Sequence, residues 1–240
     1  MHPEYIVRET ARAKHVRFRV TIPDGLVVVI PKGFDRGRIP KLVEEKRDWI
    51  ARALREIEAH RVALPPTDQR PETIELPAVG RTWRLEWDET ADEKLSIAEI
   101  EPSRLRLSGS IADRSAWRSA LRGWLLERGR EHLIPWAESM ASVLGVQVRR
   151  VSIRCQKTRW GSYSTNGTIA LNAQLLFLPE RLVRFVLLHE LCHVLHPNHS
   201  PSFWDLVRTH EPDTDCLRKE LRGGWRYVPI WLARGTKRAA

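Results

Sequence analysis

The sequence predicts an α+β fold in which a strand-rich N-terminal region with one helix precedes a mixed domain. Two observations support this prediction. Apolar and polar residues alternate over much of the first 110 residues, which is the period of β-strands. After residue 111, longer stretches with helical periodicity dominate, and only short strands lie between them. We therefore expect one region at residues 1–110 and a second domain at residues 111–240.

The first region is expected to contain a hairpin, a helix and a further set of strands. Every second residue of HVRFRVTI, residues 15–22, is apolar, and Pro23-Asp24-Gly25 then turns the chain into LVVVI. Apolar residues recur at helical spacing over residues 39–59, which predicts an amphipathic helix. LPPTDQRPE, residues 64–72, has the composition of a linker, and strands resume with WRLEW at residues 83–87. No motif with a chemical function occurs in this region.

The second domain begins with a long helix, predicted over residues 112–144. Pro135 is expected to break or kink this helix and Gly145 to stop it. The elements that follow are a strand at 146–154, a turn-rich loop at 157–167, a strand at 168–172, a helix from Pro179 to about Leu195, a helix capped by Ser200 and a last helix stopped by Gly223-Gly224. We expect Trp160, Phe203 and Trp204 to lie in the core, and the C-terminal helix to have a structural role.

The chain carries a net charge of +10, and the basic excess lies in the second domain. Residues 111–240 hold 20 basic and 11 acidic side chains. Five cations occupy the stretch 149–159: Arg149, Arg150, Arg154, Lys157 and Arg159. Such a stretch is suited to binding nucleic acid, although a basic composition also serves solubility alone.

Two features of the sequence concern its location. The first residues, MHPEYIVRET, lack the apolar core of a signal peptide, and no apolar run approaches the ~20 residues of a membrane span. Cys155, Cys192 and Cys216 are widely spaced, which favours reduced thiols over a disulfide framework. We therefore expect a cytoplasmic protein without a membrane partner.

One predicted helix combines an apolar surface with titratable groups. Apolar residues cover nearly every face between Leu182 and Leu195, which implies burial, yet the segment contains His189, Glu190 and His193. Burying these groups is costly unless they are paired or bound to a metal. His189 and His193 are four residues apart, so both imidazoles project from one face, as two ligands of one metal require. Glu190 points beside them, where it can act as a general base on a metal-activated water.

The third metal ligand is expected beyond this helix. His199 lies six residues after His193, past the Pro197-Asn198 turn, and is our choice. His196 competes for the position, but it follows His193 by only three residues in the same segment. Three protein ligands leave one coordination position of zinc open, as in catalytic sites. HExxH with a third histidine thus predicts one zinc ion per chain and peptide hydrolysis, although the spacing alone fits other first-row metals.

Residues 159–204, RWGSYSTNGTIALNAQLLFLPERLVRFVLLHELCHVLHPNHSPSFW, resemble the YgjP-like zinc metallopeptidases, relatives of the SprT and WLM proteases. RWGS, IALN, the LP helix start, HELCH and NHSxxFW follow the family's order, and the hairpin, KRDWI and QVRRVSIR extend the resemblance over most of the chain. It implies a zincin-like, minimal gluzincin-like domain with an active-site helix and a small mixed sheet. It also implies zinc ligation by His189, His193 and His199 and a base at Glu190. Tyr163 departs from the family, which usually has cysteine after RWGS.

The resemblance further implies an edge strand that holds the substrate above the active-site helix. We assign this role to Thr168, Ile169, Ala170, Leu171 and Asn172, which would bind a peptide through main-chain hydrogen bonds. An ordinary sheet edge is the alternative. Tyr163, Arg159 and His196 are candidates for stabilising the transition state, because each can donate to a developing oxyanion.

These observations favour a zinc metallopeptidase acting on a protein or peptide substrate, which includes proteins associated with nucleic acid. One alternative is a zinc-dependent hydrolase of nucleotide phosphoanhydrides, whose phosphates would meet Arg154, Lys157 and Arg159. Another is a nucleic-acid-binding module in which the metal is only structural. Of these three hypotheses, only the peptidase and the phosphoanhydride hydrolase require Glu190 for activity.

Overall fold

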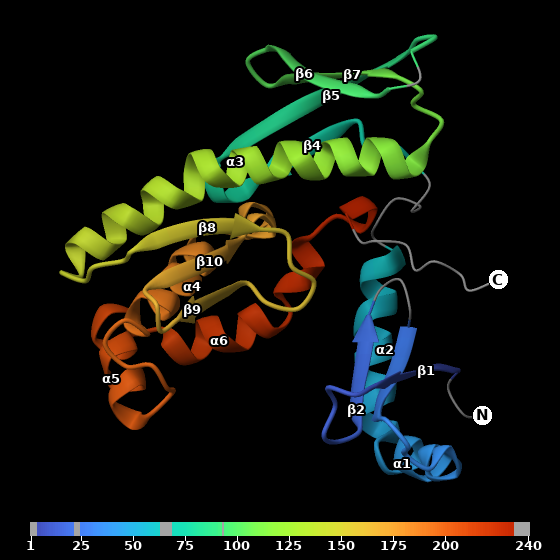
Figure 1. The fold of residues 1–240 in the computed structure, drawn as a ribbon, viewed down its shortest axis with the longest axis vertical. Coiled ribbons are helices and arrows are strands. Elements are labelled where there is room, and N and C mark those ends of the chain that lie inside the picture. Colours follow the sequence, from blue (N-terminus) through green and yellow to red (C-terminus); the bar gives the residue numbers. More distant parts are fainter. Residues whose placement is uncertain (1–3, 22–24, 63–68, 93, 233–240) are drawn as a thin grey trace. The chain divides into compact units, whose positions relative to one another are not determined.

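The computed structural model describes residues 4–21, 25–62, 69–92 and 94–232, and it is an α+β protein (Figure 1). Contacts divide the chain into two compact units, one within residues 1–69 and 229–240 and one within residues 70–228. The boundary that the sequence predicts near residue 110 lies inside the second unit. The predicted boundary says where one folded domain ends and the next begins. A division by contacts does not test this, so the boundary stays a prediction.

The first unit contains a small sheet and two helices. The strands β1 (Tyr5–Thr10), β2 (Arg17–Thr21) and β3 (Gly25–Pro31) have the order β1-β3-β2. β2 runs antiparallel to β3, as the hairpin prediction requires, and β1 runs parallel to it. Pro23 and Asp24 of the predicted turn lie outside the described residues.

The helix predicted over residues 39–59 is present as two consecutive helices. They are α1 (Ile39–Glu45) and α2 (Arg47–Val62), preceded by the short 3-10 helix η1 (Arg36–Arg38). Lys46 separates them with a non-helical backbone at φ −105° and ψ 9°. The buried core of this unit consists of Leu26, Val28, Ile30, Ile39, Val43 and Ile50. The 3-10 helix η5 (Ile230–Leu232) also belongs to this unit.

The second unit begins with a four-stranded sheet. Its strands are β4 (Thr73–Leu76), β5 (Arg81–Glu89), β6 (Ser96–Glu101) and β7 (Arg104–Gly109), in the order β4-β5-β7-β6, with the 3-10 helix η2 (Pro77–Val79) after β4. Residues 63–68, which include most of the predicted linker, lie outside the described part of the chain. Alternate residues of β5 and β7, such as Trp83, Leu105 and Leu107, are fully buried and form the face that receives the next helix.

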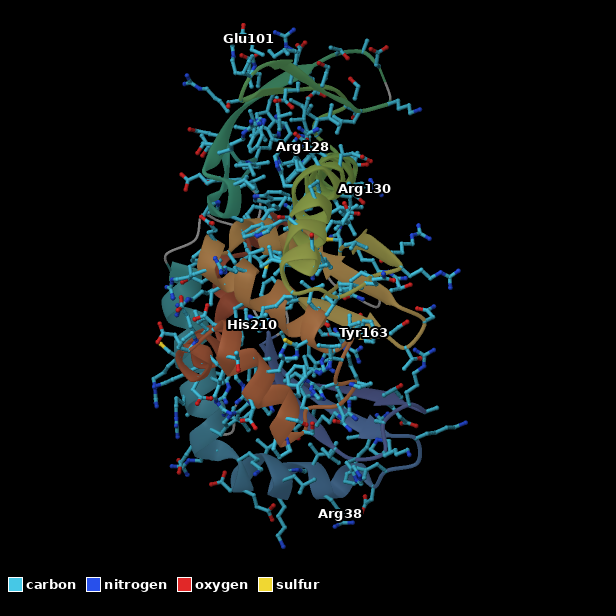
Figure 2. The ribbon with its side chains drawn as sticks, turned by 90° about the vertical axis from the view of Figure 1, so that its left-hand side faces the viewer. Arg38, Glu101, Arg128, Arg130, Tyr163 and His210 are labelled. Atoms are coloured by element: carbon cyan, nitrogen blue, oxygen red, sulfur yellow. The ribbon has the colours of Figure 1, made fainter. Side chains whose placement is uncertain are left out.

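The long helix α3 (Arg114–Val143) packs against this sheet. Trp124 meets Trp83, and Trp117 meets Trp87, in edge-to-face pairs with centroid separations of 5.1 and 5.6 Å. Such pairs add about 0.5–1.5 kcal/mol to the burial of the rings. Figure 2 shows Arg128 and Arg130 projecting from α3, and the Arg128 guanidinium pairs with Glu99 of β6 and with Glu131.

The ends of α3 agree with the sequence, and the helix is not broken in its middle. Asp113 caps the N-terminus by accepting from the Ser115 N–H at 2.7 Å. Gly145, at φ +66°, ends the helix, and the Val146 and Gly145 N–H groups donate to the Ala141 and Ser142 carbonyls. Pro135 does not break the helix, which continues through it to Val143. Packing along the whole length of α3 outweighs the loss of one backbone hydrogen bond. The other predicted outcome, a kink at Pro135, stays a prediction.

The second half of α3 packs against a three-stranded sheet (Figure 1). Its strands β8 (Arg150–Arg154), β9 (Gly161–Ser164) and β10 (Thr168–Asn172) have the order β8-β10-β9. A Cβ at Gly129 would lie 2.8 Å from Ile153 Cγ2, so this glycine permits the close approach of α3 to β8. β10 is parallel to β8 and antiparallel to β9, which makes it the central strand.

The remaining helices surround the sheet and form the rest of the second unit. They are the 3-10 helix η3 (Ala173–Phe177), α4 (Glu180–Cys192), α5 (Pro201–His210), α6 (Thr214–Arg222) and the 3-10 helix η4 (Gly224–Tyr227). α4 is buried on most faces, as predicted, but its regular part ends at Cys192 rather than near Leu195. Among the helices of the described residues, none has both the length and the apolar character needed to cross a bilayer.

Candidate metal centre

Three histidines converge at the C-terminal end of α4. His189 lies in its last turn, His193 is its C-terminal cap, and His199 follows in the turn before α5. One ring nitrogen of each lies within 4.8 Å of the other two. Nε2 of His199 is 3.0 Å from Nε2 of His189. His196 does not belong to this group, because its contribution is a backbone carbonyl rather than its ring.

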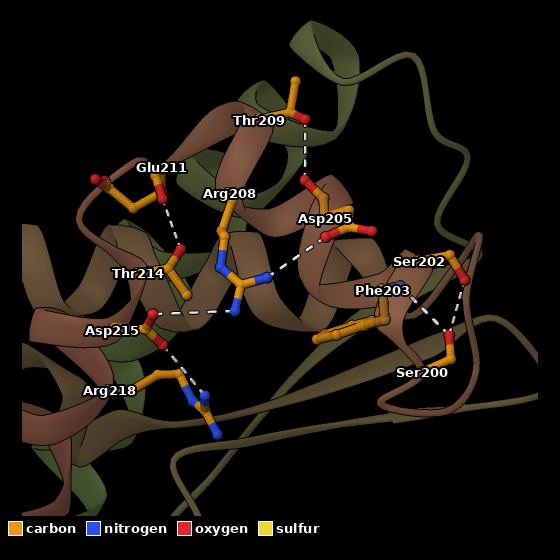
Figure 3. A network of polar contacts seen from close by, with 10 residues as sticks. All are labelled: Ser200, Ser202, Phe203, Asp205, Arg208, Thr209, Glu211, Thr214, Asp215 and Arg218. Carbon is orange, nitrogen blue, oxygen red and sulfur yellow. Dashed lines mark hydrogen bonds and ion pairs between the residues drawn. The ribbon is translucent and has the colours of Figure 1, made fainter.

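Aromatic side chains of α5 pack against the rings of His193 and His199. His193 stacks on Phe203 at a centroid distance of 4.5 Å, and His199 stacks on Trp204 at 5.5 Å. Ser200 caps α5 by accepting from the Phe203 N–H at 3.3 Å, and its Oγ is 2.9 Å from that of Ser202 (Figure 3). Because α5 starts directly after His199, this cap also sets the position of the third histidine.

The protonation state of the histidines suits a metal. His193 Nδ1 is 3.0 Å from the His196 carbonyl oxygen, which can only accept, so Nδ1 carries the proton and Nε2 is left with its lone pair. Burial, the neighbouring His193 and His199 and the charge of Arg218 lower the pKa of His189 to about 3. Burial also lowers the pKa of His193. Neutral imidazoles with converging nitrogens are the donors that zinc binds in open, three-ligand sites.

Glu190 lies beside the histidines and beneath β9. Its side chain is buried, and this burial raises the pKa of its carboxyl to about 7, against the opposing effects of a hydrogen bond from the Tyr163 backbone and the charge of Arg159. A Cβ at Gly161 would lie 2.7 Å from Glu190 Oε1. Glycine at position 161 therefore gives the carboxyl group its space.

Replacing Gly161 with alanine is expected to displace Glu190. We expect catalytic activity to fall about 100-fold, because a misplacement of ~1 Å has effects of this size, and stability to fall by about 1–3 kcal/mol through overpacking. Activity and chemical denaturation should be measured side by side with Gly123→Ala. Gly123 is an exposed position of α3 where a Cβ meets nothing within 4 Å, so that change should not reduce stability. Full activity in Gly161→Ala would show that the position of Glu190 is unimportant.

A cleft of about 420 Å³ opens next to His189 and Glu190. Three arginines and three tryptophans contribute to its walls: Arg159, Arg218, Arg222, Trp160, Trp204 and Trp225. Trp160 and Trp225 are stacked at 4.0 Å, and the Arg218 guanidinium lies 3.9 Å from the centre of the Trp204 ring. Asp215 joins Arg218 to Arg208, which in turn reaches Asp205 of α5 (Figure 3). These contacts connect the α6 wall of the cleft to α5, whose Trp204 stacks on His199.

The assignment of substrate binding to Thr168–Asn172 is wrong in its premise. β10 pairs on both sides, so its backbone has no open edge for a peptide. The Asn172 side chain is buried and donates to the carbonyls of Gln156 and Arg159, both at 2.8 Å. Asn172 therefore shapes the loop that leads into β9. The sheet edge nearest Glu190 is β9, which lies inside the loop predicted at residues 157–167.

The three candidates for transition-state stabilisation and the three aromatic residues predicted for the core lie at different places around the site. Arg159 lines the cleft, and its charge acts on Glu190. Tyr163 contacts Glu190 through its backbone rather than through its phenol. His196 holds His193 through its carbonyl. Trp160 and Phe203 are buried as expected, and Trp204 is partly buried, yet Trp160 and Trp204 also face the cleft.

Comparison with known protein families agrees with this site. A family model described as the YgjP-like metallopeptidase domain matches residues 14–223 of the chain. The chain belongs to the YgjP-like family. It is therefore a metallopeptidase, and hence a hydrolase. This YgjP-like chain has no match among the curated proteins compared with it.

Two solved structures resemble part of this YgjP-like chain. The metallopeptidase zymogen abylysin of Pyrococcus abyssi is 30% identical over 36% of this chain and 89% of its own, with a TM-score of 0.34. The metallopeptidase zymogen jannalysin of Methanocaldococcus jannaschii is 21% identical over 36% of this chain and 90% of its own, also with a TM-score of 0.34.

The sequence contained signals for two features that its interpretation missed. Asn166-Gly167 between two short strands is a typical hairpin turn, and it would have indicated β9. Arg218 and Arg222 are four residues apart on a predicted helix, so they share a face. That this face borders the metal centre is decided by the packing of α6 on α4, for which the sequence has no local signal.

Proposed function

We propose that this YgjP-like protein hydrolyses peptide bonds at a single zinc ion held by His189, His193 and His199, with Glu190 as the general base. The observation that carries the proposal is the convergence of three histidine nitrogens, all within 4.8 Å of one another, beside a buried carboxyl group. Outside this group, the described residues offer no comparable cluster of metal-binding side chains. The three rings would each contribute one nitrogen.

When bound, zinc supplies a Lewis acid that polarises the substrate carbonyl and lowers the pKa of water toward ~7. Burial raises the pKa of the Glu190 carboxyl to about 7 in the metal-free site. Beside a bound zinc ion, Glu190 would accept a proton from the attacking water and return it to the leaving amine. Arg159 is the favoured donor to the developing oxyanion, because it lines the same cleft as Glu190. Tyr163 and His196 remain weaker candidates for that role.

The substrate backbone is proposed to align along β9. No strand in the described part of the chain pairs with the outer edge of β9. The Asn172 N–H donates to the Trp160 carbonyl, so the alternation of an antiparallel ladder directs the backbone groups of Gly161 and Tyr163 away from β10. The Tyr163 N–H already donates to Glu190, so an extended peptide would pair with the N–H and carbonyl of Gly161 and with the Tyr163 carbonyl, above α4.

The proposal predicts a metal-dependent protease. Protein purified without a histidine tag is expected to contain about one zinc per chain by elemental analysis, in line with three-ligand catalytic sites. It should cleave unfolded casein, lose this activity after treatment with 1,10-phenanthroline, and regain it with Zn²⁺ but not with Mg²⁺, which prefers oxygen ligands. A folded protein that binds no transition metal would contradict the proposal. Hydrolysis of nucleoside triphosphates without cleavage of casein would favour the phosphoanhydride hydrolase instead.

We keep an association with nucleic acid as a further part of the proposal. Arg149, Arg150, Arg154, Lys157 and Arg159 are all exposed, and none pairs with a carboxylate within the described residues. Such cations can bind phosphates. Casein cleavage with and without single-stranded DNA tests this part, since an unchanged rate together with no salt-dependent DNA binding would remove it. A cytoplasmic location also stays a prediction.

A further inference from the structure

We propose that the cleft beside the metal centre recognises a carboxylate of the peptide substrate, close to the bond that is cleaved. The inference rests on the proposed peptidase function and adds a substrate class to it. It starts from the charge of the cleft walls, where three guanidinium groups, those of Arg159, Arg218 and Arg222, face a space with one carboxyl group, that of Glu190.

Two of these guanidinium groups form no ion pair among the described residues. Neither Arg159 nor Arg222 forms an ion pair with a carboxylate in the part of the chain that the structure describes. Arg218 reaches Asp215 at 3.5 Å, but Asp215 is largely exposed and the pair is therefore weak. By contrast, Arg181 outside the cleft has a partner in Glu220. Within the described residues, the cleft thus has more positive than negative side chains.

The positions of the arginines place an anion near the reacting groups. Arg218 and Arg222 are four residues apart on α6, so they point from the same face of the helix. Arg159 comes from the loop before β9. Its charge acts on Glu190, while that of Arg218 acts on His189. An anion held between these arginines would therefore lie within one or two residues of the scissile bond.

The aromatic walls strengthen this recognition. The Trp160–Trp225 stack and Trp204 give the cleft apolar walls. A peptide seated against these walls would exclude water, and charged hydrogen bonds are stronger where water is excluded. Gly224 keeps the stack close, because a Cβ there would lie 3.2 Å from the Trp160 ring. A carboxylate can accept two parallel hydrogen bonds from one guanidinium, which a neutral amide cannot do. The cleft should therefore discriminate strongly between glutamate and glutamine.

Calorimetric binding to the zinc-loaded Glu190→Gln variant tests this inference without turnover. Four peptides of one sequence would be compared, with Glu or Gln at a central position and with a free or amidated C-terminus. We expect a carboxylate-bearing peptide to bind about 10- to 100-fold more tightly than the neutral peptide, the size of one or two charged hydrogen bonds. The Glu peptide with an amidated end and the Gln peptide with a free end distinguish an acidic side chain from a C-terminal carboxylate.

Substitutions then assign the preference to the cleft. Adding Arg222→Gln, or Arg159→Gln as a second variant, should reduce the preference to less than about threefold. Lys219→Gln removes the same charge from an exposed position of α6 that does not line the cleft, and it should leave the preference intact. Circular dichroism would verify that each variant is folded.

The binding data distinguish a failure of this inference from a failure of the proposed peptidase function. Equal affinity for all four peptides would overturn the inference, and the proposed peptidase function would survive if the wild-type protein cleaves the neutral peptide. A preference that persists in both arginine variants would also overturn it. Binding of a nucleoside triphosphate without binding of any peptide would overturn both, because the anion would then be a phosphate.

Discussion

The Glu190→Gln variant is expected to lose about 10²- to 10⁴-fold in kcat while keeping its fold and its metal. Glutamine has the size of glutamate and can still accept the hydrogen bond from the Tyr163 backbone, but it cannot take a proton from water. The measurement is peptide cleavage together with zinc content by elemental analysis. Glu180→Gln is the matched control, because Glu180 lies exposed at the start of the same helix. Unchanged turnover in Glu190→Gln would remove the general base from the mechanism.

The same variant has a signature in the pH dependence of stability. The pKa of Glu190 is raised from 4.5 to about 7, so the folded metal-free protein binds more protons than the unfolded chain between these values. Its stability should therefore fall as pH rises through this window. Metal-free Glu190→Gln lacks this loss. In urea denaturation, the free energy of unfolding of the variant should therefore rise relative to that of the wild-type protein from pH 5 to pH 8. A constant difference across this range would mean that Glu190 is not buried as the structure shows.

The His199→Ala variant is expected to lose zinc affinity by more than about 100-fold, since even changes to groups that support metal ligands cost 10- to 100-fold. His199 contributes one of the three nitrogens that converge at this site. His196→Ala is the control that separates the two histidines proposed for the third ligand. It keeps the backbone carbonyl that accepts from His193, so it should retain the metal. Equilibrium dialysis against a zinc buffer measures both.

The opposite result for the two variants would change the assignment of the third metal ligand. If His196→Ala lost the metal and His199→Ala kept it, the turn after α4 would have to rearrange when metal binds. If His199→Ala failed to fold, His199→Gln would retain a side chain that can stack on Trp204, and its zinc affinity would be measured instead.

Metal binding is also expected to contribute to the stability of the second unit. His189, His193 and His199 connect the end of α4 to the start of α5, and a ligand that binds only the folded chain stabilises it. The histidines must remain neutral to bind a metal, and burial keeps the pKa of His189 low for that purpose. The same burial lowers the stability of the metal-free fold, because His189 can bind a proton in the unfolded chain but not in the folded one.

The sequence by itself determined the local parts of this protein. It indicated the buried helix α4, the shared face of His189 and His193, and the cap at Ser200, because each depends on helical geometry over a few residues. It also predicted His199 as the third ligand, because His199 lies past the Pro197-Asn198 turn, and in the structure this ring lies beside the other two. A break of α3 at Pro135, one of the two outcomes predicted there, is absent, because packing along α3 outweighs the local rule.

Only the tertiary structure decided which other groups lie around the three histidines and Glu190. The order β8-β10-β9 places β10 in the centre and β9 at the edge, and strand order follows from pairing between distant segments rather than from residue pattern. The cleft likewise combines Arg159 with Arg218 and Arg222, which are about sixty residues apart in the chain and are brought together by the packing of α6 on α4. Helical spacing is encoded locally, whereas a surface built from several segments exists only once the core has folded.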